Sequence, residues 1–416
     1  MYSFVISIYA IGAWIASWFS KKVRKMIVGQ RQTFAILKKN ISKEDRVVWF
    51  HAASLGEFEQ GRPIMERVRK YHPEYKILLS FFSPSGYEVR KDYKGADVIC
   101  YLPFDVDLNA HLFLKYAHPE IVLFIKYEFW YLYLMMAHRR GCKLYSVSSI
   151  FRPNQYFFTW LGKHQLRSLY QFDHFFVQNE QSKQLLAKNG ITCATVTGDT
   201  RFDRVLDIRN ASADLPIVKQ FCHGSKTFIA GSSWEPDEEI YIPYFAKHRD
   251  WKLIIAPHVI GENHLKKIEA QLEENGFSYA RYSDLERRHS ASLSLGGEAD
   301  VLIVDCFGKL SSIYRYATVA LVGGGFGAGI HNVPEAAVYG IPVLFGPNNK
   351  KFMEAQELLK VGASFEYIDA DSFAQLMNRF IKEPAFLEDA GHKASEYITK
   401  NAGAADVVYH HIFGEN

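Results

Sequence analysis

A carboxylate follows an apolar stretch early in the chain, at a position where it could act as a general base. Residues 47–50 are apolar throughout, as a buried strand of a parallel sheet requires. Small residues follow them and lead to Glu57. In open α/β sheets, ligands bind just beyond the carboxyl ends of the strands. A carboxylate held there can accept the proton of a substrate hydroxyl, so Glu57 is a candidate catalytic residue.

The same spacing also fits a helix cap. Ser54 and Glu57 match the Ser-x-x-Glu capping box, in which the glutamate only accepts a backbone N–H at a helix start. Pro63 favours the catalytic interpretation, because proline prefers the first turn of a helix. A helix that begins near Arg62 would leave Glu57 on a loop. On the sequence alone, both interpretations stay open.

A second carboxylate is expected at a strand end. Glu128 follows the apolar run 121–125. Glu128 could serve only as a favourable charge at a helix N-terminus. Because it would emerge near Glu57 at the same edge of a sheet, a functional role is favoured.

A metal site is not expected. Asp105 and Asp107 form an Asp-x-Asp pair, but their positions at a predicted helix start favour capping and helix-dipole roles. The 16 His residues show no metal-ligand spacing, and the five Cys residues show no C-x-x-C pairing. Such cysteines are typical of small buried residues in a reducing compartment.

Strand–helix junctions in the second half could hold a phosphorylated ligand. Residues 230–235 (AGSSWE) end a predicted strand and open a helix, where small residues and N–H groups suit a phosphate. An ordinary serine-capped helix fits this segment equally well. The segments 256–258 and 305–310 follow the next two predicted strands.

The strongest indication of a nucleotide-binding site in this half is a glycine-rich turn at residues 323–325. Glycines there would let a nucleotide approach the backbone closely. Asn332 is expected to cap a helix whose N-terminus faces a phosphate, and Glu335 in its first turn could bind ribose hydroxyls. The turn also resembles a dinucleotide fingerprint, which requires an acidic residue about twenty positions later. Residues 342–347 carry no charge, which excludes a dehydrogenase.

Two sets of alternating strands and helices would position these residues, and they predict doubly wound parallel sheets. The polar residues 206–225 are expected to link a Rossmann-like domain at 21–205 to a second one at 226–416. Strands are expected at residues 47–50, 76–82, 97–101, 121–125, 143–147, 174–177 and 192–196, and then at 227–230, 252–256, 301–304, 319–322 and 342–345.

Size and composition are those of a globular protein. The chain has 416 residues, 48% apolar and 23% charged, and its net charge of +4 gives no reason to expect a nucleic acid partner. Residues 1–20 carry no charge and precede a basic cluster at residues 21–39. We expect a membrane-anchor helix at 1–20 that spans the bilayer or lies on it, with the domains in the cytoplasm.

Several motifs together resemble the 3-deoxy-D-manno-octulosonic acid (Kdo) transferases. Residues 51–57 (HAASLGE) are similar to the His-x-x-Ser-x-Gly-Glu signature of that family, and residues 127–130 (YEFW) to its Glu-x-Trp element. Residues 198–203 (GDTRFD) match its Gly-x-x-Lys-Phe-Asp segment. Arg201 replaces the lysine there, which keeps the charge but changes its geometry.

The resemblance continues in the second half with two departures. Residues 256–258 (APH) resemble a Pro-Arg-His segment of the family, but the arginine is missing or His258 occupies its place. Residues 305–310 (DCFGKL) resemble its Gly-Asp-Thr-x-Gly-Glu-Leu segment, with Lys309 at the glutamate position. The matching motifs occur in the same order along nearly the whole chain.

The resemblance implies a GT-B architecture, in which two Rossmann-like domains face a cleft, together with the N-terminal membrane anchor. It implies an inverting transferase at the inner membrane that moves Kdo from CMP-Kdo to the lipid A precursor (lipid IVA) in lipopolysaccharide core biosynthesis, without metal or other cofactor. Glu57 would be the general base, and Glu128 and Arg201 would orient groups and stabilise charge. The implied donor contacts are Ser232, Pro257, His258, Phe307, Gly308, Lys309, Gly324, Asn332, Val333, Pro334 and Glu335.

Two alternatives use the same features. One is another GT-B transferase, or an epimerase, that acts on a UDP-sugar. The other is a membrane-tethered protein that binds a nucleotide sugar without catalysis. Donor specificity separates the first from a Kdo transferase, and turnover separates the second.

Overall fold

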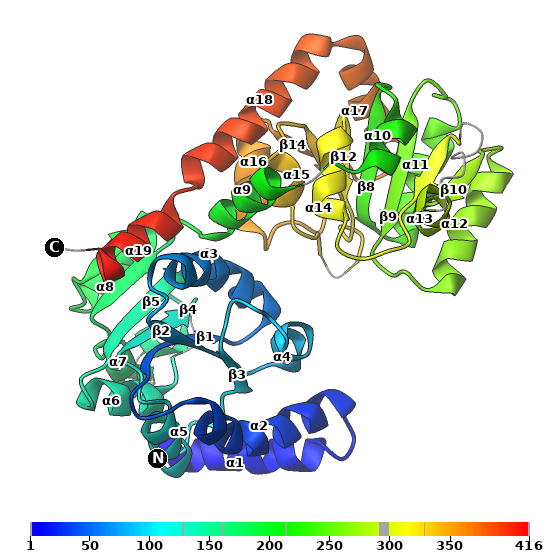
Figure 1. Cartoon of the computed structure of the whole chain (residues 1–416). Coiled ribbons are helices and arrows are strands. Elements are labelled where there is room, and N and C mark those ends of the chain that lie inside the picture. The colour runs from blue at the N-terminus through cyan, green and yellow to red at the C-terminus, as the bar shows by residue number, and fades with distance from the viewer. Residues whose placement is uncertain are drawn as a thin grey trace. The chain divides into compact units, whose positions relative to one another are not determined.

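The computed structural model describes residues 2–126, 129–159, 162–212, 214–290, 299–327 and 329–414. It divides into two compact units, the first made of Met1–Arg204 and Asn401–Asn416 and the second of Val205–Lys400. Each unit is built on one seven-stranded sheet whose neighbouring strands are parallel (Figure 1). The predicted fold class, two doubly wound parallel sheets, is confirmed.

The sheet of the first unit has the strand order β3-β2-β1-β4-β5-β6-β7. Its centre is formed by β1 and β4, which are apolar over most of their length. All strands predicted for this half of the chain are present. Their bounds are β1 Arg46–Ala52, β2 Tyr75–Phe81, β3 Val98–Tyr101, β4 Ile121–Ile125, β5 Lys143–Ser149, β6 His174–Val177 and β7 Ala194–Val196.

Helices cover both faces of this sheet. One face packs against α2, α5 and α6, and the other against α3 and α19 (Figure 1). The helices of the first unit are α1 Tyr2–Ala16, α2 Lys21–Asn40, α3 Leu55–Tyr71, α4 Pro84–Arg90, α5 Asp107–Ala117, α6 Tyr131–Arg139, α7 Lys163–Leu169, α8 Glu180–Lys188 and α19 Ala404–Phe413.

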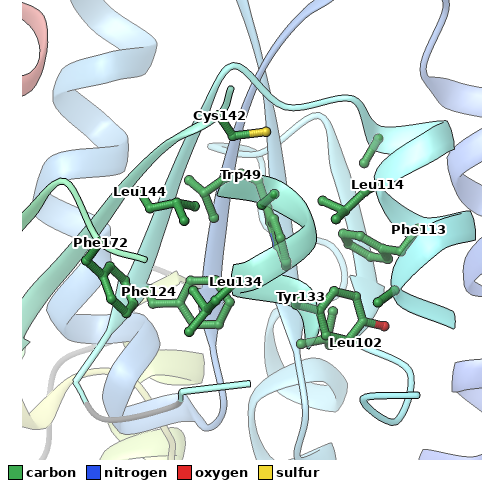
Figure 2. Packing of buried hydrophobic residues seen from close by; sticks show 14 of the residues in the cluster. Trp49, Leu102, Phe113, Leu114, Phe124, Tyr133, Leu134, Cys142, Leu144 and Phe172 are labelled. Atoms are coloured by element: carbon green, nitrogen blue, oxygen red, sulfur yellow. The ribbon is translucent and has the colours of Figure 1, made fainter. Parts of the chain in front are cut away.

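Trp49 of β1 lies in the middle of the first of these two cores (Figure 2). Its ring centroid is 4.8 Å from that of Phe113, 5.4 Å from Phe124 and 6.0 Å from Tyr133. All four side chains are fully buried. Burying a side chain of phenylalanine size contributes about 1.5–3 kcal/mol. This packing therefore holds firmly the strand that leads to Glu57.

The sheet of the second unit has the strand order β10-β11-β9-β8-β12-β13-β14. Its core includes the fully buried Tyr241, Ile268 and Phe373, from three different helices. The strands are β8 Thr227–Ser233, β9 Lys252–Pro257, β10 Tyr279–Arg281, β11 Val301–Ile303, β12 Val319–Val322, β13 Val343–Phe345 and β14 Ser364–Glu366. The helices are α11 Glu235–Phe245, α12 Glu262–Glu274, α13 Tyr282–Ser290, α14 Leu310–Ile313, α15 Pro334–Ala337, α16 Met353–Val361, α17 Ala370–Lys382 and α18 Pro384–Asn401.

The predicted domain limits differ from the structure in two places. The region expected as a linker at 206–225 contains the second half of α9 Arg201–Ala211 and all of α10 Pro216–Cys222. The chain after residue 400 belongs to the first unit, although 226–416 was the expected second domain. Asp203 explains part of this return, because its carboxylate accepts the backbone N–H groups of Gly403 at 2.9 Å and Ala405 at 3.3 Å. These bonds hold the start of α19.

The N-terminal segment forms two helices rather than one. The first, α1, ends at Ala16, and α2 begins at Lys21, so the helix expected over residues 1–20 is shorter. Within the part of the chain that the structure describes, no helix is both long and apolar enough to cross a bilayer. Tyr2 and Ser3 attach α1 to the first unit, because they donate hydrogen bonds to Asp105 at 2.6 Å and Asp107 at 2.9 Å.

Asp105 has the structural role that the sequence predicts, but for a different helix. It precedes α5, yet its carboxylate accepts the backbone N–H groups of Leu132 and Tyr133 at 3.0 Å each. These residues lie in the first turn of α6. Asp105 therefore satisfies the N-terminus of α6 from a distant point of the sequence.

Candidate active site

The first group of candidate residues lies at the topological switch point of the first unit. β1 pairs with β2 on one side and with β4 on the other. The connections that follow β1 and β4 therefore leave in opposite directions, which opens a crevice beyond the carboxyl ends of these two strands. Glu57 follows β1 and Lys126 follows β4. The topology thus brings both residues to the place where open α/β sheets bind ligands.

Glu57 lies in the first turn of α3, not on a loop. The helix begins at Leu55, so the prediction of a start near Arg62 is wrong, and Pro63 lies inside the helix. Ser54 is extended and donates its backbone N–H to Oε2 of Glu57 at 3.0 Å. The capping contact is therefore present. It stabilises the helix start, and it also fixes the direction of the carboxylate.

The surroundings of Glu57 favour proton transfer as well. Its exposed fraction is only 7%. Burial raises the pKa of this carboxyl above its usual value, and the positive charge of Lys126 partly offsets the effect. A carboxylate with a raised pKa is a stronger base. Capping and catalysis are thus compatible at Glu57.

Arg201 is brought to the same helix through two side chains that the sequence analysis did not single out. Gln60, one turn after Glu57, donates from Nε2 to Oδ1 of Asp199 at 2.8 Å. Arg201 donates to Oδ2 of Asp199 from Nε at 3.0 Å and from a terminal nitrogen at 2.8 Å. Thr200 donates to the carbonyl of Gln60 at 2.6 Å. The 198–203 segment is therefore bound directly to α3.

Asp199 sets the position of the Arg201 guanidinium. It is 5% exposed, and burial alone would raise its pKa, but the Arg201 charge holds that pKa below the usual value. Asp199 is thus ionised. Two guanidinium N–H groups of Arg201 donate to its Oδ2 and the Arg201 backbone N–H donates to its Oδ1, and these bonds together fix the direction of the guanidinium. Its place two residues before Arg201 in the 198–203 motif was the available sequence signal. Glu128, the third predicted catalytic residue, lies outside the described residues.

His51, the first residue of the 51–57 motif, supports the site rather than lining it. The ring is fully buried, and its Nδ1 lies 2.8 Å from the hydroxyl of Ser80 on β2. Burial lowers the pKa of His51 to about 3, so the ring is neutral. Ser80 also accepts a hydrogen bond from the indole of Trp49 at 2.8 Å. This contact joins β1 to β2 just before the chain turns toward Glu57.

The second group of candidate residues lies at the switch point of the second unit. β8 pairs with β9 on one side and with β12 on the other. The turn after β8 contains Trp234, and the turn after β12 contains the glycines 323–325. Asp237 joins the two turns, because its Oδ2 accepts the N–H of Trp234 at 3.0 Å and of Gly324 at 3.2 Å. Its other oxygen accepts the Tyr367 hydroxyl at 2.8 Å.

The glycines are needed for contacts within the protein. A Cβ on Gly323 would lie 2.3 Å from the carbonyl oxygen of Ser232, and one on Gly325 would lie 2.4 Å from Gly346. Gly324 has a φ of 94°, in the left-handed region that favours glycine. Close approach of a nucleotide was the predicted reason for these glycines. The structure adds a second reason, which is the packing of one protein turn on another.

Glu335 and Asn332 form one polar group, although their predicted helix roles are wrong in part. The residue at the N-cap of α15 is Val333, not Asn332, and α15 spans only four residues. Asn332 donates from its amide to Oε1 of Glu335 at 2.7 Å, and Ser311 donates to Oε2 at 3.1 Å. The two carboxylate oxygens are thus oriented by side chains, while Pro334 and Val333 are buried.

An aromatic stack lies beside this turn and includes two residues that were not predicted. The rings of Trp234 and His258 are stacked with centroids 4.8 Å apart, and His258 stacks on His331 at 4.3 Å. The Trp234 indole donates to Nε2 of His331 at 3.3 Å. Burial lowers the pKa of both histidines, and for His331 the neighbouring His258 adds to the effect. His258 follows Pro257, the last residue of β9.

The remaining predicted donor contacts differ in how accessible they are. Phe307 is 81% exposed and is followed by Gly308, with a φ of 81°. Lys309 is turned toward α13, where its ammonium lies 3.1 Å from Glu286 and 5.2 Å from the centre of the Tyr282 ring. Ser232 has a φ of 51° at the irregular end of β8. Phe307 therefore offers a free aromatic face, whereas Lys309 is already paired.

Comparisons with known proteins show which proteins this chain is similar to. Residues 28–204 match the family model described as 3-deoxy-D-manno-octulosonic-acid transferase (kdotransferase). The 3-deoxy-D-manno-octulosonic acid transferase of Chlamydophila psittaci is 26% identical over 379 residues, which cover 89% of this chain and 83% of that relative. The resemblance to the Kdo transferases is confirmed. It does not depend on one motif, since the similarity to that Kdo transferase spans both units.

A second relative and a solved structure are also similar to this chain. A bifunctional glycosyltransferase/methyltransferase of Fusobacterium nucleatum is 26% identical over 378 residues, or 88% of this chain, and the chain spans 57% of its length. The solved structure of UDP-GlcNAc 2-epimerase from Neisseria meningitidis bound to UDP-GlcNAc has a TM-score of 0.57 at 15% identity, and the match covers 86% of this chain and 99% of that one. The likeness to the epimerase shows the shared fold alone, whereas the similarity to the Kdo transferases lies in the sequence itself.

Proposed function

We propose that this protein is an inverting Kdo glycosyltransferase of lipopolysaccharide core biosynthesis that moves Kdo from CMP-Kdo to the lipid A precursor (lipid IVA). The observation that carries the proposal is Glu57, a buried carboxylate with a raised pKa at the switch point of the first unit. It lies inside the region that matches the Kdo transferase family model. A pure binding protein would need Glu57 only as the cap of α3.

In the proposed reaction, Glu57 takes the proton of the acceptor hydroxyl as its oxygen bonds to the anomeric carbon of Kdo. The bond from that carbon to the phosphate oxygen of the donor breaks at the same time, and its electron pair leaves with CMP. Attack from the face opposite the leaving group inverts the configuration. Arg201, oriented by Asp199, would stabilise negative charge near the reacting groups, and Glu128 would orient the acceptor.

The second unit would bind the donor. The exposed Phe307 ring would stack on the cytosine, and Glu335, oriented by Asn332 and Ser311, would accept the ribose hydroxyls. The arginine of the family's Pro-Arg-His segment is missing here or is replaced by His258. A neutral histidine binds a phosphate less strongly than an arginine, but an anionic ligand would favour its protonation. His331 would act with it, since the two rings are stacked.

Membrane attachment is part of the proposal. The α1 helix and the turn after it expose apolar side chains, among them Ile11 at 59%, Trp18 at 61% and Phe19 at 86%. We propose that they insert into the inner membrane from the cytoplasmic side, and that the basic residues after them face anionic lipids. The proposed partners are thus CMP-Kdo, the lipid A precursor and inner-membrane lipids, without nucleic acid.

The transfer is proposed to need no metal, because CMP leaves as a phosphate monoester whose charge cationic side chains can accept. The test is incubation of the purified protein with CMP-Kdo and a tetraacylated lipid A precursor, followed by mass spectrometry of the lipid. A product heavier by one or more Kdo residues, formed equally in EDTA, is expected. Activity on UDP-GlcNAc instead would favour the UDP-sugar alternative, and no turnover with either donor would favour a binding protein.

A further inference from the structure

A cavity of about 490 Å³ lies on the first unit, between α2, α4 and the end of β3. It is distinct from the candidate active site, because none of its lining residues belongs to that group. The helices α2 and α4 lie beside each other and beside β3 (Figure 1). The cavity is lined by Lys21, Arg24, Lys25, Val28, Gly29 and Gln32 of α2, Tyr87 and Glu88 of α4, and Tyr101 of β3.

The charge in this cavity is positive. Three cations come from the first turns of α2, and one carboxylate, Glu88, opposes them. Lys25 is paired with Glu88 at 2.9 Å. Arg24 donates to the carbonyl oxygens of Ser17 at 3.0 Å and Trp18 at 2.9 Å, which fixes the turn between α1 and α2. Lys21 is exposed and has no ion-pair partner among the residues that the structure describes.

Packed aromatic rings form the bottom of this cavity, so it is more than a basic surface. A Cβ on Gly29 would lie 2.3 Å from the ring of Tyr101, so only glycine lets this ring pack against α2. Tyr101 in turn lies against Tyr87, with ring centroids 4.2 Å apart. Tyr101 is 1% exposed, and it lines the cavity together with Glu88.

Apolar side chains stand next to the cations. Val28, which lines the cavity, is 48% exposed, and Trp18 and Phe19 in the preceding turn are exposed further. A soluble anion would gain nothing from these apolar neighbours. An amphiphile gains from both, because its chains bury the apolar side chains while its anionic group meets the cations.

We infer that this cavity binds the phosphate headgroup of an anionic lipid, with Lys21 as its principal contact. The inference rests on the membrane attachment proposed above and not on the transfer reaction. The site would fix the orientation of the first unit on the bilayer, since a pocket binds one headgroup in one place while a diffuse basic surface does not.

Lys21 and Lys22 offer a matched pair for the test. Both are exposed lysines in the first turn of α2, but only Lys21 lines the cavity. Lys21→Gln and Lys22→Gln remove the same charge from neighbouring positions in one helix turn. The full-length proteins are sedimented with vesicles of phosphatidylcholine alone and of phosphatidylcholine mixed with phosphatidylglycerol.

The parent should prefer the mixed vesicles, and Lys21→Gln should lose at least about tenfold more of that preference than Lys22→Gln. Equal losses would overturn the pocket and leave general attraction to a charged surface. No preference of the parent for phosphatidylglycerol would also overturn it. Transfer to a detergent-solubilised acceptor should be unchanged in Lys21→Gln. Loss of that transfer would assign Lys21 to the acceptor instead, whereas an inactive parent would refute the proposed reaction without affecting the vesicle result.

Discussion

The Glu57 carboxylate lies at a helix N-terminus, accepts the N–H of Ser54 and is almost fully buried. A backbone hydrogen bond stabilises the ionised form, while burial opposes it, and here burial prevails because the pKa is raised. The cap thus holds the carboxylate in place, and the apolar surroundings make it basic. Substitution of Glu57 tests this balance between its hydrogen bond and its burial.

Glu57→Gln should abolish transfer with little change in stability. Glutamine keeps the volume and can still accept the Ser54 N–H, but it cannot take a proton. Removal of a general base costs about 10²–10⁴ in rate. The measurements are kcat by mass spectrometry, the melting temperature and CMP binding. Glu66→Gln, at a half-buried glutamate of the same helix that pairs with Arg62, is the control and should remain active.

The pH profile provides a second check on the same residue. Because the base must be ionised, kcat/KM of the parent should fall as the pH drops through the raised pKa of Glu57. The acid limb should therefore begin above the pH at which an ordinary glutamate titrates, and any residual activity of Glu57→Gln should lack it. A variant that turns over at nearly the parent rate would reduce Glu57 to a cap.

Glu335→Ala should weaken donor binding and leave the fold intact. The carboxylate is held by Asn332 and Ser311 and is half-buried, so its loss removes a charged acceptor without opening a core cavity. A hydrogen bond to a charged group is worth about 1.5–3 kcal/mol, so the KM for CMP-Kdo should rise tenfold or more. Ser311→Ala, which keeps the carboxylate, should have a smaller effect. An unchanged KM in Glu335→Ala would exclude a ribose contact.

The sequence indicated the residues of the site better than their partners. Glu57 was recognised because it occurs after a predicted strand, and Arg201 because residues 198–203 resemble a family segment, but the link through Gln60 and Asp199 was not. That link joins residues 139 positions apart in the sequence, and no local pattern reports such a contact. The stack of His258 with His331 was missed for the same reason, since the rings come from different strand ends.

At the scale of elements, twelve strands were predicted and two were missed. Most of the twelve are apolar runs that the sheets bury, although β7 at the edge of the first sheet is only partly buried. The two missed strands, β10 and β14, are the edges of the second sheet. Each has three residues, and no residue of β10 is fully buried. An edge strand with few buried side chains lacks the apolar run that marks a central strand.

The start of α3 was misplaced because a local rule was overridden. Proline is disfavoured inside a helix, since it lacks an N–H and crowds the preceding turn. Pro63 nevertheless lies in α3, where it is buried with Ile64, Met65 and Val68 against the sheet. Packing of this face thus outweighs the local cost. The packing of α19 on the first unit could not be predicted from the sequence either, because its partner Asp203 lies some two hundred residues earlier.

Asp203→Ala should release α19 from the first unit. The carboxylate accepts the N–H groups of Gly403 and Ala405 at the start of that helix, and loss of such a cap costs about 0.5–2 kcal/mol. We expect a lower urea midpoint and faster proteolysis of residues 401–416. Asp214→Ala, at an exposed aspartate, should change neither. Unchanged proteolysis in Asp203→Ala would show that apolar contacts alone hold α19.

At the scale of the whole molecule, each unit has its own core, and the N-terminal helices are added to the first one. The fully buried residues of the two large clusters in that unit come from residue 37 onward. The α1 helix contributes Ile6, Ala10 and Ala13, which are only partly buried against Met26, Tyr101 and Phe104. The fold of the first unit therefore does not depend on α1, while the exposed apolar side chains of α1 remain to be explained by attachment.

Removal of residues 1–20 should release the protein from membranes and leave it folded. Asp105 loses its bond from Tyr2 but keeps the two N–H groups of α6, so no buried carboxylate is left unpaired. A modest decrease in melting temperature is expected, because the small cluster around Phe104 becomes exposed. Sedimentation with inner-membrane vesicles measures attachment, and transfer to a detergent-solubilised acceptor measures function.

The control for this truncation is the full-length double variant Trp18→Ser/Phe19→Ser. It keeps α1 and every basic residue but removes the two most exposed aromatic side chains of the turn. If apolar insertion is the main anchor, both proteins should leave the membrane fraction, and both should still transfer Kdo in detergent. If the truncated protein still sediments with membranes, the basic residues of α2 must supply most of the attachment. In that case the salt concentration, and not the apolar face of α1, should control release, because attraction between exposed charges is screened within about 10 Å at 0.1 M salt.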